Sequence, residues 1–310
     1  MPGGRAVVRM AREYRAAVAR DRGAQPEVAR STPSIAHPRG DRRHFAATWI
    51  GHSTVLLQVG GVNVLTDPVF CRRASPVPWL GPRRLVDPAV EITALPPLDV
   101  VLISHNHYDH LDKAAVRHLA AASPDTTWVV PLRLGDTIRK WGARRTVELD
   151  WWQSAAVSGM VVTATPARHF SSRGFHDRNR TLWCGYALAM GGWRGLFVGD
   201  TAYHPDFGEI GSRCGPFDLV MVPIGAYEPR WFMKSVHVDP DEAVQVYQDL
   251  ASAHAEAPLP LMLAVHWGTF RLTTEPVDEP PRRVMERWGA VDLSSARLWI
   301  ARFGESRVVG

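Results

Sequence analysis

The chain has 310 residues, of which 45% are hydrophobic and 22% are charged, and its formal net charge at pH 7 is +5. This composition is typical of a folded globular protein and excludes a largely disordered chain. No apolar run approaches the roughly 18 residues that a membrane-spanning helix needs, so we expect no such helix. The positive charge favours acidic partners, such as phosphate groups, nucleic acid or an anionic lipid surface.

Residues 1–43 are predicted to be an appendage that contains a basic N-terminal helix and a Pro-rich linker. Arginines interrupt its apolar positions every few residues, so the segment lacks the apolar core of a secretory signal. The three cysteines have no CxxC spacing, which agrees with a reducing compartment. We therefore expect a cytoplasmic protein.

The predicted N-terminal helix has two interpretations. We favour a solvated helix or a disordered leader. Alternatively, the helix lies on an anionic membrane and makes the protein peripheral there. In that case its apolar side chains would face the lipid, namely those of Val7, Val8, Met10 and Tyr14.

Residues 44–310 are predicted to form one domain of the α/β class. Short apolar runs of β type come first as hairpins, and glycine pairs mark two turns, at Gly60 and Gly61 and at Gly191 and Gly192. Later runs alternate with helical periodicity in three segments, 112–123, 132–142 and 239–256. This order indicates two sheets packed as a sandwich with helices outside.

The stretch SHNHYDHLD, residues 104–112, directly follows the apolar run LDVVLI. A strand that ends at Ser104 would release four ligand-type side chains into a loop at the edge of the sheet, those of His105, His107, Asp109 and His110. The first two histidines share one face of an extended segment and can bind one metal ion, while the other two residues turn toward a second. Imidazole and carboxylate groups without a nearby thiolate suit zinc, iron or manganese.

Three further candidate ligands each follow an apolar run of β type: His169, Asp200 and His266. Each of them alone is more often a structural residue. In this order after an HxHxDH pattern, they indicate the remaining ligands of a binuclear site.

This ordered pattern resembles the metallo-β-lactamase superfamily, whose fold is an αββα sandwich with a two-metal site at its edge. Within that superfamily, the sequence is similar to the N-acylphosphatidylethanolamine-hydrolysing phospholipase D family. The closer resemblance covers roughly residues 44–307 and is carried by stretches such as TWIGHSTVLLQVGGVNVLTDPVF, VELDWW, FVGDTAY, IGAYEPRWFM, HVDPDEAV and AVHWGTF. The implied fold has two mixed sheets flanked by helices.

The resemblance also implies the ligand set. His105, His107 and His169 would bind one divalent ion, Asp109, His110 and His266 the other, and Asp200 would bridge them. The ions are usually zinc in this family, and iron or manganese are compatible with the same ligands. The implied reaction is attack of a metal-bound hydroxide on phosphorus.

The implied catalytic residues are Asp109, Asp200 and His237. His237 would contact the scissile phosphate or protonate the leaving group; alternatively, it is a helix-start residue with a structural hydrogen bond. Asp67 and Asp112 are predicted to orient ligand imidazoles, or else to cap turns. His52 resembles a family position near the site, but a single histidine after a strand is more often structural.

The implied substrate is an N-acylphosphatidylethanolamine-like lipid, and a long apolar channel to the metals would favour it. The alternatives are a lactonase or phosphodiesterase acting on a soluble phosphorylated metabolite, or a nuclease, since this fold serves many reactions. We expect no nucleic-acid partner, because there is no continuous basic tract or added nucleic-acid module. The complete HxHxDH disfavours a non-enzymatic metal-binding or redox protein. The resemblance further implies a homodimer.

Overall fold

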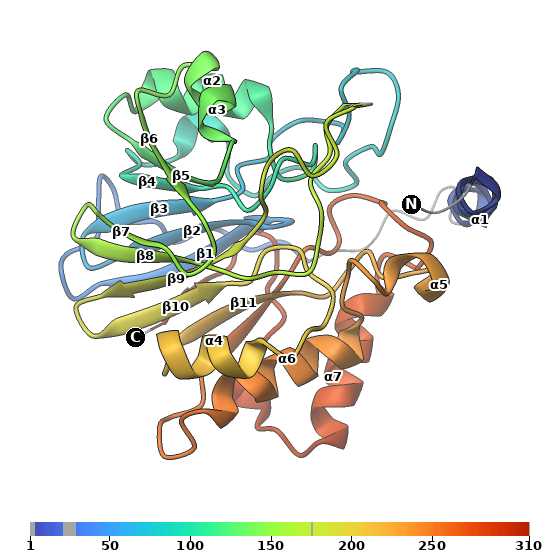
Figure 1. Ribbon diagram of the computed structural model, residues 1–310. Coiled ribbons are helices and arrows are strands. Elements are labelled where there is room, and N and C mark those ends of the chain that lie inside the picture. Colours follow the sequence, from blue (N-terminus) through green and yellow to red (C-terminus); the bar gives the residue numbers. More distant parts are fainter. Residues whose placement is uncertain (1–3, 21–28, 175, 310) are drawn as a thin grey trace.

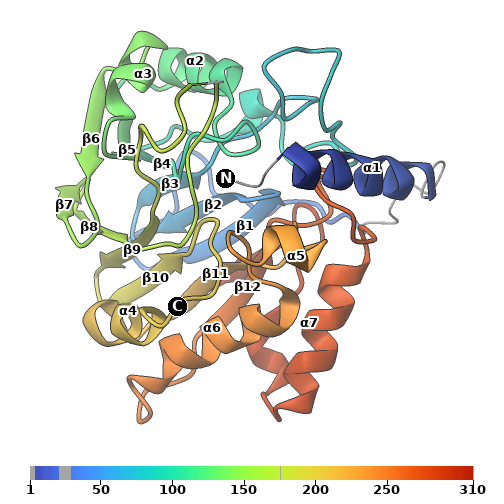
Figure 2. The ribbon, with the colours of Figure 1, turned by 45° about the vertical axis from the view of Figure 1, so that its right-hand side comes forward.

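The computed structural model describes residues 4–20, 29–174 and 176–309. Two seven-stranded sheets lie face to face, and helices cover the outer face of each sheet (Figures 1 and 2). The predicted αββα sandwich of two mixed sheets is therefore confirmed. None of the helices within these ranges has the length and apolarity that crossing a bilayer requires.

The first sheet has the spatial order β14-β1-β2-β3-β4-β5-β6. Neighbouring strands are antiparallel from β14 to β3 and parallel from β3 to β6. Helices α2 and α3 cover its outer face (Figure 1). The elements of this half are β1 (Phe45–Gly51), β2 (Thr54–Val59), β3 (Val62–Thr66), β4 (Val100–Leu102), α2 (Lys113–Ala122), β5 (Thr127–Pro131), α3 (Gly135–Lys140), β6 (Arg145–Leu149) and β14 (Ser306–Val308).

The second sheet has the order β13-β12-β11-β10-β9-β8-β7. Strands β7 to β10 are antiparallel and β10 to β13 are parallel. Helices α4, α6 and α7 lie on its outer side (Figure 2). The elements of this half are β7 (Ser154–Val157), β8 (Met160–Thr165), β9 (Gly185–Met190), β10 (Trp193–Phe197), α4 (Phe207–Cys214), β11 (Leu219–Pro223), α5 (Arg230–Met233), α6 (Pro240–Ser252), β12 (Leu261–Val265), α7 (Glu279–Ala290) and β13 (Leu298–Trp299). Short 3₁₀ turns span Ile92–Ala94 and Ser295–Arg297.

The apolar run before the histidine-rich loop is buried on both of its faces. Val100 and Leu102 of β4 point into the core between the sheets, whereas Val101 and Ile103 belong to the core beneath the helices of the first sheet. Successive side chains of a strand point to opposite faces, so a continuous apolar run satisfies both cores. The loop that follows is thereby anchored at a fixed point of the sheet edge.

Several predicted elements are present. The Gly60 and Gly61 pair connects β2 to β3, and the Gly191 and Gly192 pair connects β9 to β10, both as antiparallel hairpins. The three predicted helical segments contain α2, α3 and α6. Helix α6 begins with a capping box, in which the Asp239 side chain accepts from the Glu242 backbone N–H and the Glu242 side chain accepts from the Asp239 backbone N–H.

The segment before the domain is more closely attached than the sequence predicts. Residues 21–28 of the predicted linker lie outside the described residues. The part that follows is bound to the sandwich: Ser31 N–H donates to Phe303 O at 2.9 Å, and the Gln58 side chain hydrogen-bonds both the N–H and the carbonyl of Ala36. This part of the linker therefore runs along the domain instead of projecting from it.

Candidate metal centre

Ligand-type side chains from both sheets meet at one edge of the sandwich. Strands β4, β8, β10 and β12 all end at this edge, and the loops that follow them carry the residues predicted from the sequence. The loop after β4 contributes four side chains and the loops of the second sheet contribute three, namely those of His105, His107, Asp109 and His110, and of His169, Asp200 and His266. All seven predicted ligand side chains lie in this cluster.

Three histidines form the first group. His107 Nδ1 lies 2.8 Å from His105 Nε2 and 3.2 Å from His169 Nε2. These nitrogen atoms therefore face a common point between two loops of opposite sheets. Three imidazoles around one point are a typical donor set for a divalent transition-metal ion.

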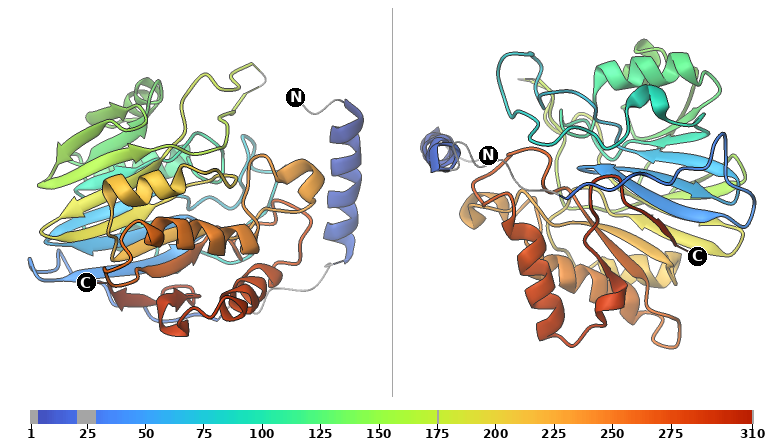
Figure 3. Two further views of the ribbon diagram at one scale, coloured as in Figure 1. Left: turned by 60° about the horizontal axis from the view of Figure 1, so that its bottom comes forward. Right: turned by 180° about the vertical axis from the view of Figure 1, so that it is seen from behind.

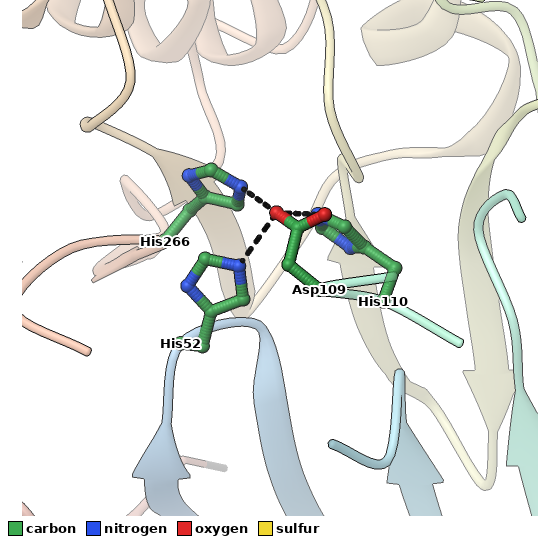
Figure 4. Close-up of side chains that lie close together, drawn as sticks. All are labelled: His52, Asp109, His110 and His266. Atoms are coloured by element: carbon green, nitrogen blue, oxygen red, sulfur yellow. Dashed lines mark hydrogen bonds and ion pairs between the residues drawn. The ribbon is translucent and has the colours of Figure 1, made fainter. Parts of the chain in front are cut away.

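The second group contains His52, Asp109, His110 and His266 (Figure 4). Asp109 Oδ2 lies at its centre, 3.1 Å from His52 Nε2 and 3.4 Å from the Nε2 atoms of both His110 and His266. His52 is the residue whose role the sequence left open. It lies in the turn between β1 and β2 with a positive φ of 56°, and its ring packs against that of His266, with 4.0 Å between ring centroids and 39° between the ring planes.

Asp200 lies between the two groups. Its Oδ2 atom is 3.1 Å from His110 Nε2 and 3.2 Å from His266 Nε2. From the first group, it lies 3.9 Å from His169 Nε2 and 4.0 Å from His105 Nε2. The preceding Gly199 has a φ of +68°, and an added Cβ would lie 3.0 Å from Cys184 O and 3.1 Å from Ser104 Cβ. The glycine thus allows the close approach that brings the Asp200 carboxylate to this position.

His237 also reaches the cluster, from the segment between α5 and α6. Its Nε2 atom lies 3.8 Å from Asp200 Oδ2, and the side chain is buried. His169, Asp200 and His237 form a further group with metal-binding spacing. The structure therefore places His237 beside the cluster, and its catalytic role stays a prediction.

Hydrogen bonds behind the cluster orient the imidazole rings. His110 Nδ1 donates to Asp67 Oδ2 at 2.7 Å, and His169 Nδ1 donates to Val236 O at 2.8 Å. These bonds leave the Nε2 lone pairs directed toward the centre. Asp67 therefore has the orienting role predicted for it. Asp112 instead caps α2, because its side chain accepts from Ala114 N–H and Ala115 N–H.

The donor atoms fit a metal ion. Among the described residues, His110 Nε2, His266 Nε2 and Asp200 Oδ1 are buried without a hydrogen-bond partner. A buried polar atom without a partner is costly, and a coordinated ion would satisfy all three. The side chains present are thus suited to hold divalent metal.

The charges of the cluster are strongly coupled. Burial raises the pKa of the Asp109 and Asp200 carboxyl groups, but nearby His110 outweighs it and holds both pKa values well below their usual range. Burial lowers the pKa of the two partner imidazoles, but Asp200 and Asp109 outweigh it; they raise the pKa of His110 well above its usual value and that of His266 to about 9. The carboxylates therefore retain protons on two imidazoles, which a metal ion would displace.

A cavity of about 260 Å³ opens onto this cluster. Its floor includes His107, Asp109 and Asp200, with His169 and His237 beside them. Most of its remaining lining is apolar, from Met10, Phe170, Phe232, Met233, Val236 and Leu272. The candidate metal centre is thus exposed to a cavity with apolar walls.

Comparison with known proteins agrees with this architecture. Residues 62–267 match the sequence model of a family described as the β-lactamase superfamily domain. The fold is similar to that of a possible metal-dependent hydrolase from Veillonella parvula, with a TM-score of 0.66 and 17% sequence identity, over 86% of this chain and 99% of that one.

Two relatives have considerably higher sequence identity. An uncharacterized protein of Mycobacterium tuberculosis is 45% identical over 80% of this chain, and the chain spans 65% of that relative's length. N-acyl-phosphatidylethanolamine-hydrolyzing phospholipase D 1 of Caenorhabditis elegans is 41% identical over 84% of this chain and 74% of its own length. The chain belongs to the metallo-β-lactamase superfamily of metal-dependent hydrolases and, within it, to the family of N-acylphosphatidylethanolamine-hydrolysing phospholipase D homologues.

Proposed function

We propose that the protein is a phosphodiesterase of phospholipase D type that acts on N-acylphosphatidylethanolamine-like lipids. The observation that carries this proposal is the position of the histidine and aspartate cluster at the floor of a cavity whose other walls are mostly apolar. A phosphodiester could lie against the cluster while adjoining lipid atoms contact those walls. The similarity to the C. elegans phospholipase D supports the same substrate class.

The proposal assigns the cluster two divalent ions, for which zinc suits the donors well and iron or manganese are alternatives. His105, His107 and His169 would hold one ion, and Asp109, His110 and His266 the other. Asp200 would bridge, because its carboxylate faces donor nitrogens of both sets. His52, at 3.1 Å from Asp109 Oδ2, would orient that carboxylate.

When bound, such ions supply an activated water and neutralise negative charge on the phosphoryl group. The contribution of His237 follows from its surroundings. Burial holds the pKa of its imidazole well below the usual value, so the ring is neutral at pH 7. A neutral imidazole can donate a hydrogen bond to a phosphoryl oxygen, which favours a phosphate contact over protonation of the leaving group.

The test is product identification by mass spectrometry, with zinc-loaded protein in H₂¹⁸O. Hydrolysis of N-acylphosphatidylethanolamine at phosphorus consumes one water, breaks the P–O bond to the ethanolamine oxygen and gives phosphatidic acid and N-acylethanolamine. We expect ¹⁸O in the phosphatidic acid. Label in the N-acylethanolamine would mean attack at carbon and would contradict the proposed reaction.

Two variants and a second substrate complete the experiment. Asp200→Asn should abolish the products, whereas Asp206→Asn, a half-exposed carboxylate in the same loop, should not. A small soluble phosphodiester is assayed in parallel. If only this small substrate is cleaved, the lipid assignment fails and a soluble phosphorylated metabolite becomes the better substrate class.

A further inference from the structure

The N-terminal helix α1 (Gly4–Arg20) has one face directed toward the domain. Its less exposed side chains recur with helical spacing, at Ala6, Met10, Glu13, Tyr14 and Ala17. Ala17 is 4% exposed, whereas Val8 on the other side is 70% exposed. This is a helix packed along one stripe. Met10 and Tyr14, which the membrane interpretation put on the lipid-facing side with Val8, thus lie on the face toward the domain, so α1 is neither a fully solvated helix nor a disordered leader. Contact of the protein with a membrane stays a prediction.

Specific contacts hold α1 against the edge of the sandwich that carries the candidate metal centre. Tyr14 Oη donates to Arg271 O at 2.9 Å, and Arg20 donates to Thr274 O at 3.2 Å. Both acceptors lie in the loop that follows β12. Helix α1 is thus attached to the same loop at two points almost two turns apart.

A second set of contacts joins α1 to α5. The Trp231 indole N–H donates to Glu13 Oε2 at 3.3 Å, and the Arg9 guanidinium lies 4.3 Å from the centroid of the Trp231 ring. Figure 3 shows α1 standing beside α5 at this end of the molecule. The helix therefore bridges α5 and the loop after β12.

Both attachment segments line the cavity over the metal centre, and so does α1 itself. Phe232 and Met233 come from α5, Leu272 and Thr273 come from the loop, and Met10 comes from α1. The methionine side chain is flexible and apolar, which suits contact with an alkyl group of variable shape. Sites that enclose a whole drug-sized ligand usually have volumes of roughly 300–1,000 Å³, and this cavity is smaller. Each residue of its wall therefore contacts a substantial part of any bound group.

We propose that α1 is one wall of the substrate-binding site, and that Met10 is a specificity-determining residue that contacts the apolar group next to the scissile phosphodiester. This inference rests on the proposed function, because it assigns the cavity a phosphodiester with an apolar substituent. It adds a segment outside the matched family domain to the determinants of substrate selection.

The test uses soluble p-nitrophenyl alkyl phosphates below their critical micelle concentrations, with full-length zinc-loaded protein. For the wild type, kcat/KM should increase from the methyl to the decyl ester. Met10→Ala should lower kcat/KM for the decyl ester about three- to tenfold, mainly through KM, and leave the methyl ester nearly unchanged. Alanine is a good helix former, so the substitution preserves α1.

Val8→Ala is the matched control, because it shortens an apolar side chain of the same helix on the exposed side. It should leave both esters unchanged. An equal loss of kcat/KM for the decyl ester in Val8→Ala and Met10→Ala would overturn the inference, because the loss would then not depend on the side chain that lines the cavity. A wild-type protein that cleaves the decyl ester no better than the methyl ester would also overturn it.

A binding measurement gives a readout that does not depend on turnover. Amide hydrogen exchange within α1 should slow when decylphosphonate is added, and should not respond to methylphosphonate. The lipid assay decides the proposed function separately. If N-acylphosphatidylethanolamine is not cleaved but the decyl preference exists and depends on Met10, the proposed lipid is wrong and the role of α1 stands. If exchange in α1 responds to neither compound, the wall assignment is wrong.

Discussion

Asp67 and His110 form a buried pair in which one carboxylate oxygen accepts from the imidazole Nδ1 at 2.7 Å. The same carboxylate also accepts from the Ser104 backbone N–H at 2.7 Å and from the Ser104 hydroxyl at 2.6 Å. Both Asp67 oxygens are therefore used, and the pair fixes which nitrogen of His110 faces the cluster. Such partners commonly matter as much for metal affinity as the ligands themselves.

We accordingly expect Asp67→Asn to lower zinc affinity about 10- to 100-fold. Asparagine has one oxygen and one NH₂ group in place of the two carboxylate oxygens. Its NH₂ group would therefore face a hydrogen-bond donor, either that of Ser104 or that of His110. Competition with a fluorescent chelator measures the affinity. Asp112→Asn is the control, because it removes a buried carboxylate that caps α2; it should lower stability and keep zinc affinity. Equal zinc affinity of both variants would contradict the orienting role.

Metal binding should release protons at pH 7. His266, with a pKa of about 9, and His110, with a pKa well above its usual value, are protonated in the metal-free protein, whereas a ligand imidazole must be neutral. Zinc affinity should therefore rise as the pH increases toward 9, and fewer protons should be released per ion there. Isothermal titration calorimetry in buffers of different ionisation enthalpy counts these protons. Heats that do not depend on the buffer at pH 7 would refute this expectation.

His237→Ala should lower kcat by about 10²- to 10³-fold, the usual effect of removing one hydrogen-bond donor from a developing negative charge. Bound zinc, measured by elemental analysis after gel filtration, should be unchanged. If the variant loses zinc, His237 is a metal ligand, as its spacing to His169 and Asp200 would also permit. Unchanged kcat together with unchanged zinc would assign it a structural role.

Gly199→Ala should destabilise the protein more than Gly191→Ala. Both glycines have positive φ, which costs other residues about 1–2 kcal/mol. A Cβ at Gly191 meets nothing within 4 Å, whereas at Gly199 it would press on Cys184 and Ser104. Urea unfolding of both variants gives the two free energies of unfolding. Equal losses would mean that the close approach at Gly199 carries no extra cost.

The sequence predicted the sandwich and the members of the metal cluster because their signals are local. A continuous apolar run buried on both faces, followed at once by ligand-type residues, places those residues at a sheet edge. The signal of His52 was weaker: the resemblance put it near the site, but it is a single histidine in a hairpin turn. The side-by-side order of β1, β2, β3 and β4 in the first sheet brings it to Asp109. Its proximity depends on contacts far apart in the chain.

The sequence did not predict helix α4, because tertiary contacts override the low helix propensity of its residues. Helix α4 contains Gly208 and Gly211, which lower intrinsic helix propensity and hide the helical pattern. A Cβ at Gly211 would lie only 2.5 Å from Leu250 O of α6, so the glycine is required for close packing of the two helices. Likewise, the spacing of α1 predicts an apolar face but does not reveal which surface covers it.

The division of the donor atoms between the two sheets has a mechanical consequence. His105, His107, Asp109 and His110 follow a strand of the first sheet, while His169, Asp200 and His266 follow strands of the second. An ion held by both sets would act as a cross-link between the halves of the chain, in the way that a disulfide joins distant segments. Removal of the ion by a chelator would then remove this cross-link, and on heating the two halves could separate first at this end of the sandwich.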